Sequence, residues 1–237
     1  MKRVSLILAF ILFLINMPRH ATGDDADQPK QSSPATIEAA DNSQILFDDT
    51  MLLDGYAKRF KGLPSEIILE MIKDESLNAY KVSAAVRVFR EQYANAVVSR
   101  EKNNIEKILL RCLNRTDSIF VQVEIFYTLT FLDRYKYFEW TVPLLIQKLE
   151  HYNSAVNDIA FEGLSQIINM ENNKRAREAR IVFNTLRKML FLSRNRLAHV
   201  SVPDQKLTQK LQLLRWSIKV LGNQELKKLP KEIIPLL

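Results

Sequence analysis

Apolar side chains recur every three or four positions along most of the chain, and this spacing places them on one face of an α-helix. No stretch alternates apolar and polar residues for long enough to indicate a β-strand. Most apolar segments are followed, after a short polar turn, by a second apolar segment. The pattern therefore predicts an all-α chain of about four helical hairpins, at residues 64–89, 105–132, 142–168 and 174–221.

Residues that favour helix ends mark the limits of these hairpins. Pro64 opens the first hairpin, because proline suits the first turn of a helix. Asp74-Glu75-Ser76 provides the turn between its two helices. Gly222 follows the last apolar position of the fourth hairpin, where glycine commonly ends a helix. In the fourth hairpin we expect a loop at 193–205, longer than the loops of the other three.

Equivalent apolar positions repeat with a period close to 40 residues. They are separated by 41, 36 and 41 positions at Ile72, Leu113, Leu149 and Leu190. The sequence LPSEIILEM at 63–71 is echoed by LPKEIIPLL at 229–237, where Pro235 prevents a full helix. A period near 40 filled by helix–turn–helix units is typical of an α-solenoid. We expect 229–237 to fold back as a short cap over the last helix.

The turn and second-helix segments resemble HEAT and armadillo-type repeats. The resemblance is carried by Val82-Ser83-Ala84-Ala85-Val86-Arg87 after Asp74, by Val121-Gln122-Val123 after Asn114, and by Ile159-Ala160 with Gly163-Leu164. It covers residues 63–222. It implies a right-handed α-solenoid that serves as a scaffold or a recognition module and that carries no shared catalytic residues.

The first 23 residues have the pattern of a signal peptide. Lys2 and Arg3 precede an apolar run of about 14 residues, and the run ends before Pro18. Ala21-Thr22-Gly23 then supplies the small residues that a signal peptidase reads. The run is too short to span a bilayer core, which needs roughly 20 residues. We therefore predict export, periplasmic or secreted, with cleavage after Gly23; a signal that stays as a membrane anchor is the alternative.

The net charge of +7 conceals an uneven distribution. Residues 24–54 carry −7, because eight acidic side chains accompany a single lysine, whereas residues 55–237 carry +11. The acidic segment has few apolar residues, which favours disorder. We therefore divide the chain into a signal peptide (1–23), an acidic disordered leader (24–54) and a helical domain (55–237). Apolar residues between Ile45 and Leu52 could dock on the first hairpin.

The inventory of reactive side chains is small. Of the three histidines, His20 lies in the signal peptide, and His151 and His199 lie in predicted turns. No His or Cys pair has metal-ligand spacing, no G-x-S-x-G motif occurs, and the five glycines form no phosphate loop. We identify no catalytic, cofactor-binding or metal-ligating residue and predict a non-enzymatic protein. The single cysteine, Cys112, is expected to be a small buried apolar side chain.

Basic side chains gather on one side of the helix predicted between Lys174 and Leu192. An arc of about 100° contains Arg177, Arg180, Asn184, Arg187, Lys188 and Phe191. Arg194 and Arg196 extend the basic run into the following loop. Guanidinium groups bind phosphate and carboxylate oxygens through paired hydrogen bonds. These basic residues and Phe191 are candidates for binding an anion or a partner, and an ordinary solvated helix face is the alternative.

An aromatic stripe marks the helix predicted after Asp117. Phe120, Tyr127, Phe131, Tyr135 and Phe138 project within roughly 80° of one another. The opposite face also carries apolar residues, and a helix that is apolar on two sides is buried on two sides. We therefore interpret the stripe as core. As an alternative, Phe120, Tyr127, Phe131 and Tyr135 line a partner-binding groove, with tyrosine hydroxyls at its rim.

The export signal, the repeats and the lack of catalytic residues together predict an exported scaffold that binds a protein partner. The alternative is a protein that binds an anionic surface through residues 174–196: lipid headgroups, a cell-envelope polyanion or, ranked last, nucleic acid. Binding to phosphate-like groups weakens steeply with salt, which separates the two functions. Asn114-Arg115-Thr116 also matches a glycosylation sequon.

Overall fold

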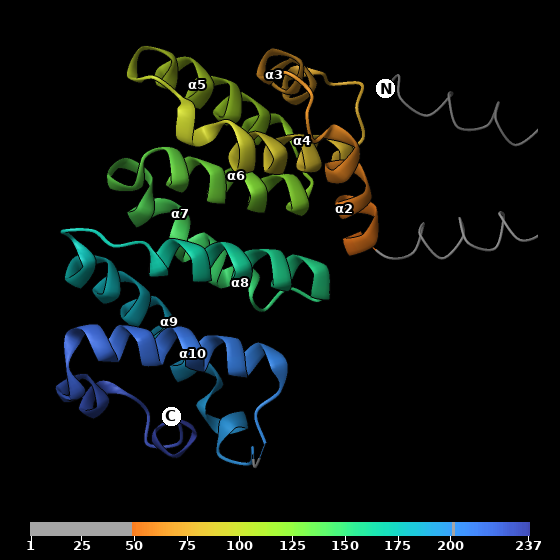
Figure 1. The fold of residues 1–237 in the computed structure, drawn as a ribbon. Coiled ribbons are helices and arrows are strands. Elements are labelled where there is room, and N and C mark those ends of the chain that lie inside the picture. The colour runs from red at the N-terminus through yellow and green to blue at the C-terminus, as the bar shows by residue number, and fades with distance from the viewer. Residues whose placement is uncertain (1–48, 201) are drawn as a thin grey trace, which may run out of the picture. The chain divides into compact units, whose positions relative to one another are not determined.

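The computed structural model describes residues 49–200 and 202–237, which belong to one unit of the chain, Asp41–Leu237. Every regular element in these ranges is a helix, which confirms the predicted all-α class (Figure 1). The α-helices are α2 (Asp49–Phe60), α3 (Ser65–Lys73), α4 (Ala79–Gln92), α5 (Ser99–Arg115), α6 (Ile119–Leu132), α7 (Arg134–Lys148), α8 (Ser154–Asn169), α9 (Arg175–Leu197) and α10 (Gln205–Leu221). The short 3₁₀ helices are η1 (Ala94–Ala96), η2 (Asn223–Lys228) and η3 (Ile234–Leu236).

Polar side chains cap the N-terminal ends of four helices. Asn78, Asp133, Asn153 and Asp204 precede α4, α7, α8 and α10, and each accepts a hydrogen bond of 2.7–3.1 Å from a backbone N–H of the first turn. Helix α10 ends at Gly222, whose φ of 101° is a conformation that favours glycine. Turn residues in the sequence thus fix where these helices begin and end.

The helices pack in two rows. Helices α4, α6, α8 and α10 lie next to one another in chain order and form the second row (Figure 1). Helices α3, α5, α7 and α9 form the first row: α3 packs on α5, α7 packs on α9, and Glu106 of α5 accepts hydrogen bonds from Lys136 and Tyr137 of α7. Each first-row helix also packs on the second-row helix that follows it in the chain.

Helix α6 is buried on both sides, as its two apolar faces predict. Val123 and Tyr127 belong to the core cluster shared with α7, α8, α9 and α10, whereas Ile125 and Leu129 belong to the cluster shared with α3, α4 and α5. On the first of these sides α8 approaches closely at Gly163. A Cβ atom there would lie 3.0 Å from the ring of Tyr127, so the lack of a side chain permits this contact.

The segment after α10 folds back onto the core, as we expect for residues 229–237. Leu229 and Ile233 are buried in the same cluster as Leu214 and Ile218 of α10. The guanidinium of Arg215 donates 2.9 Å hydrogen bonds to the backbone carbonyls of Leu236 and Leu237. Apolar packing and backbone hydrogen bonds together therefore hold the closing residues against α10.

The predicted leader boundary at residue 54 is wrong, because helix α2 already begins at Asp49. Helix α2 packs on α4, and Leu53 is buried in the core cluster that also contains residues of α6 and α8. Asp49 holds its first turn in place, accepting hydrogen bonds from the Tyr80 hydroxyl at 2.5 Å and from the Asn153 side chain at 2.6 Å. The predicted signal peptide, 1–23, and residues 24–48 lie outside the described residues.

Two helix boundaries also differ from prediction. The aromatic stripe does not follow one helix, because Asp133 ends α6 and caps α7, so Tyr135 and Phe138 belong to α7. Helix α7 begins at Arg134, eight residues before the predicted start at 142, and it contains Pro143 in its interior. Helix α9 continues to Leu197. The basic residues Arg194 and Arg196, predicted in a loop, are therefore on the last turn of α9.

A buried carboxylate joins the second-row helices α4 and α6. Glu124 is fully buried and accepts hydrogen bonds from Arg87 at 2.7 Å and from Arg90. Burial alone would raise the pKa of Glu124, but the two guanidinium groups outweigh it and hold that pKa below its usual value. Arg87 also pairs with Asp54 of α2 at 2.6 Å, and Arg90 stacks on the ring of Tyr127 at 3.8 Å. The network ties three helices together.

Candidate functional site

The first half of the basic face of α9 is neutralised by carboxylates from other elements. Arg177 pairs with Glu139 of α7 at 2.6 Å. Arg180 pairs at 2.7 Å with the buried Glu225 of η2. Hydrogen bonds from Lys228 and Arg180 hold the pKa of Glu225 below its ordinary value. These two arginines therefore join α9 to its neighbours through ion pairs.

The second half of the basic face of α9 borders a groove. Arg187, Lys188, Phe191 and Leu192 of α9, together with Lys228, line an open groove of about 530 Å³. Phe191 is 52 % exposed and Leu192 is 85 % exposed. The Arg194 guanidinium stacks on the Phe191 ring at 4.3 Å and donates to its backbone carbonyl at 3.1 Å. We call this set of residues, with Arg194, the α9 patch.

Within the described part of the chain, the three cations of the α9 patch that lie on α9 have no ion-pair partner. No carboxylate in residues 49–200 and 202–237 lies within 4.0 Å of Arg187, Lys188 or Arg194, and Lys228 shares Glu225 with Arg180. Arg196, on the same turn as Arg194, is exposed and has no carboxylate partner in these ranges either. The structure thus divides the predicted anion-binding residues into a paired group and an unpaired group.

Most of the aromatic candidates are core residues. Tyr127 is 2 % exposed, and burial raises its pKa to about 12. Its hydroxyl donates to the Gln166 side chain on α8. Phe120 and Phe131 are half-buried against the core clusters. Tyr127 is thus a core residue, and Phe120 and Phe131 pack on the core with part of each side chain exposed.

Tyr135 is the exception, and α7 exposes a second aromatic residue, Trp140. Tyr135 is 61 % exposed, and the ammonium of Lys174 lies 4.5 Å from its ring centroid. Trp140 is 44 % exposed, with its ring packed edge-on against Phe126 at 5.8 Å. Glu139 lies between them along the exposed side of α7. We call Tyr135, Glu139 and Trp140 the α7 surface.

Sequence reasoning missed Trp140 because the start of α7 was placed too late. With the helix starting at Arg134, a 100° rotation per residue puts Trp140 on the side opposite the buried Val142 and Leu145, whereas Tyr135 lies on the first turn, about 140° around the helix from Trp140. Asp133, a favoured N-cap residue, was the signal that could have revealed this boundary. Leu192 and Lys228 were missed for another reason, since the groove forms only when η2 packs near α9.

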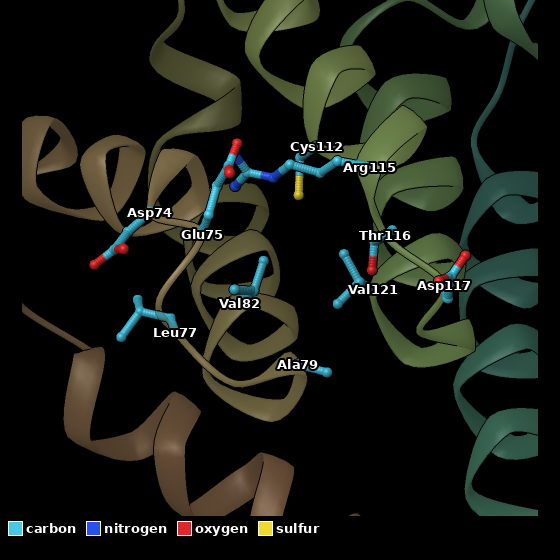
Figure 2. A pocket seen from close by; sticks show the side chains of 10 residues that line it. All are labelled: Asp74, Glu75, Leu77, Ala79, Val82, Cys112, Arg115, Thr116, Asp117 and Val121. Atoms are coloured by element: carbon cyan, nitrogen blue, oxygen red, sulfur yellow. The ribbon is translucent and has the colours of Figure 1, made fainter. Parts of the chain in front are cut away.

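A further hollow lies between the α3–α4 turn and the end of α5 (Figure 2). It measures about 350 Å³, with apolar side chains such as Val82 and Val121 in its walls. The Arg115 side chain extends toward Glu75 (Figure 2) and donates a hydrogen bond of 2.6 Å to the backbone carbonyl of Lys73. Cys112 is buried here, as predicted, and burial raises its thiol pKa. Arg115 thus fixes the end of α3.

Comparison of the chain with protein-family models, with curated proteins and with solved structures gave no match. Within residues 49–200 and 202–237, no helix is long and apolar enough to cross a membrane. The same residues bring together no group of three or more His, Cys, Asp or Glu side chains that could hold a metal ion. The α7 surface and the α9 patch are therefore the two candidate sites that the geometry defines.

Proposed function

We propose that this chain is an exported, HEAT-like right-handed α-solenoid of four hairpins that binds a protein partner through the α7 surface. The two rows support the solenoid, because each of the four pairs α3–α4, α5–α6, α7–α8 and α9–α10 packs on the next pair. The pattern of residues 1–23 supports export. Such repeats act as recognition scaffolds by presenting extended surfaces.

The choice of the first row follows from helix α2. Solenoids bind more often on the surface made by their second-row helices. Here α2 packs on α4, and its Leu53 is 1 % exposed within the core cluster that also contains residues of α6 and α8. Asp49 and Asp54 fasten it to Tyr80 and Arg87. Part of the second row is therefore already occupied by the chain itself, whereas the first row is open at α7.

The observation that carries the proposal is the exposure of Tyr135 and Trp140 on one helix. Tyrosine and tryptophan dominate protein interfaces, because each buries a large rigid area and keeps a polar group at the rim. Trp140 is anchored edge-on against Phe126, and Lys174 orients the ring of Tyr135. Both side chains are thus held in place before a partner arrives. Glu139 and Arg177 provide a polar edge of mixed charge, which suits a protein better than a polyanion.

Site-specific photo-crosslinking in the cells that produce the chain tests this function. A photoreactive phenylalanine analogue replaces Tyr135 in one variant and Lys219, an exposed residue of α10, in a control variant. We expect a discrete crosslinked protein from position 135 and none from position 219. The same adduct from both positions, or adducts only from position 219, would reject the α7 surface as the contact.

A further inference from the structure

We propose that the α9 patch docks on an anionic lipid bilayer, with Phe191 and Leu192 entering the interface and the surrounding cations contacting lipid phosphates. This inference is independent of the protein partner at α7. It rests on three observations of the structure: unpaired cations, adjacent exposed apolar side chains, and an open groove beside them.

The charge of the α9 patch complements an anionic surface. Arg187, Lys188 and Arg194 have no carboxylate within ion-pair distance in the described ranges, so docking breaks none of the ion pairs found there. Lys228, which lines the groove, pairs with the buried Glu225, and Arg180 shares that carboxylate. Each lysine or arginine close to an anionic membrane strengthens binding by about fivefold.

The apolar side chains distinguish a bilayer from the other anionic partners. Leu192 is 85 % exposed and lies directly beside Phe191 in the chain, with Lys188 and Arg187 one turn earlier. A helix that carries large apolar residues flanked by basic ones lies at the boundary between headgroups and acyl chains. Nucleic acid would neutralise the cations, but it offers no apolar volume for Leu192. Arg194 covers the Phe191 ring with its guanidinium and leaves the charge at the level of the phosphates.

A local fluorescent probe tests the proposal in the full chain. Cys112, which is buried, is replaced by alanine, and an environment-sensitive fluorophore is attached to Leu192→Cys or, as a control, to Tyr152→Cys on the α7–α8 turn. The control position reports whether attachment through another segment, such as the apolar residues 4–17, is enough to bring a probe into the bilayer. We expect a severalfold rise and a blue shift at position 192 on phosphatidylcholine vesicles with about one-third phosphatidylglycerol. Position 152 should change little.

Charge variants complete the test. In the labelled chain, Arg187→Gln with Lys188→Gln should weaken the response at position 192 by about 25-fold in lipid concentration, from two cations at about fivefold each. The control pair, Lys107→Gln with Arg111→Gln, removes the same charge from α5 and should have little effect. Circular dichroism melting verifies that all variants fold. Supporting results are a response that needs phosphatidylglycerol and these two cations.

Three outcomes would overturn the proposal. A response at position 192 on pure phosphatidylcholine of equal size would remove the anionic requirement. No response on the phosphatidylglycerol vesicles would exclude docking through this patch. A response to DNA or heparin without any response to vesicles would assign the patch to a soluble polyanion. None of these outcomes bears on the crosslink at Tyr135, because the vesicle assay contains no protein partner.

Discussion

Replacement of Glu124 by glutamine is the sharpest test of how the helices are held together. The carboxylate is fully buried, and its partners Arg87 and Arg90 have side chains that are only 14 % and 7 % exposed. Glutamine keeps the shape but removes the charge, so Arg90 is left buried without a counter-charge. Arg87 retains Asp54 at 2.6 Å. Breaking a buried ion pair costs about 3–5 kcal/mol, and the surviving Asp54 contact places this variant near the lower limit, about 3 kcal/mol.

The melting temperature reports this loss directly. For a folded domain of this size, 1 kcal/mol corresponds to about 2–4 °C, so Glu124→Gln should lower the midpoint by about 6–12 °C. Glu139→Gln is the matched control, because the Glu139–Arg177 pair is 68 % and 64 % exposed and such pairs contribute less than about 1 kcal/mol. Melting is followed by circular dichroism at neutral pH. Equal midpoints for the two variants would refute the reasoning.

Three further predictions concern packing, ionisation and the chain's end. Gly163→Ala should destabilise the domain by about 1–3 kcal/mol in urea unfolding, because the new methyl group lies 3.0 Å from the Tyr127 ring; an unchanged midpoint would contradict this. Ultraviolet titration should find Tyr80 and Tyr127 ionising near pH 12. Because folding raises both pKa values, the stability that these two residues contribute is present below about pH 10 and is lost as the pH rises through 12. Truncation after Gly222 uncovers the core beneath Ile233 and should cause aggregation or an earlier melting step; a monomer of full stability would disprove the role of this segment.

The helices and the core faces were predictable because they depend on local sequence. Apolar spacing at 3.6 residues per turn identifies α6 and both of its buried sides, and Gly222 marks the end of α10. The start of α7 was not predictable by the same pattern. Pro143 interrupts the usual helix signal, and the single residue Asp133 separates two helices that read as one. Helix α2 was missed because the partners of its acidic residues lie far along the chain: Arg87 pairs with Asp54, and Tyr80 and Asn153 donate hydrogen bonds to Asp49.

The candidate sites were predictable only in part, for a related reason. Residue spacing places Arg177, Arg180 and Arg187 on one face of α9, but it does not reveal which of them meet carboxylates. Glu139 and Glu225 come from α7 and η2, and they neutralise the first two. Only tertiary packing separates the paired arginines from the unpaired ones, and the same packing creates the groove beside Phe191.

The affinity of the partner captured at the α7 surface tests the central claim most directly. With that partner purified, its dissociation constant is measured by titration calorimetry for the parent chain, for Tyr135→Ala with Trp140→Ala, and for Tyr152→Ala, which removes an even more exposed aromatic residue from the α7–α8 turn. We predict at least about 30-fold weaker binding for the double variant, as for interface residues worth 2 kcal/mol or more, and unchanged binding for the control. Equal affinities for all three chains would contradict the account.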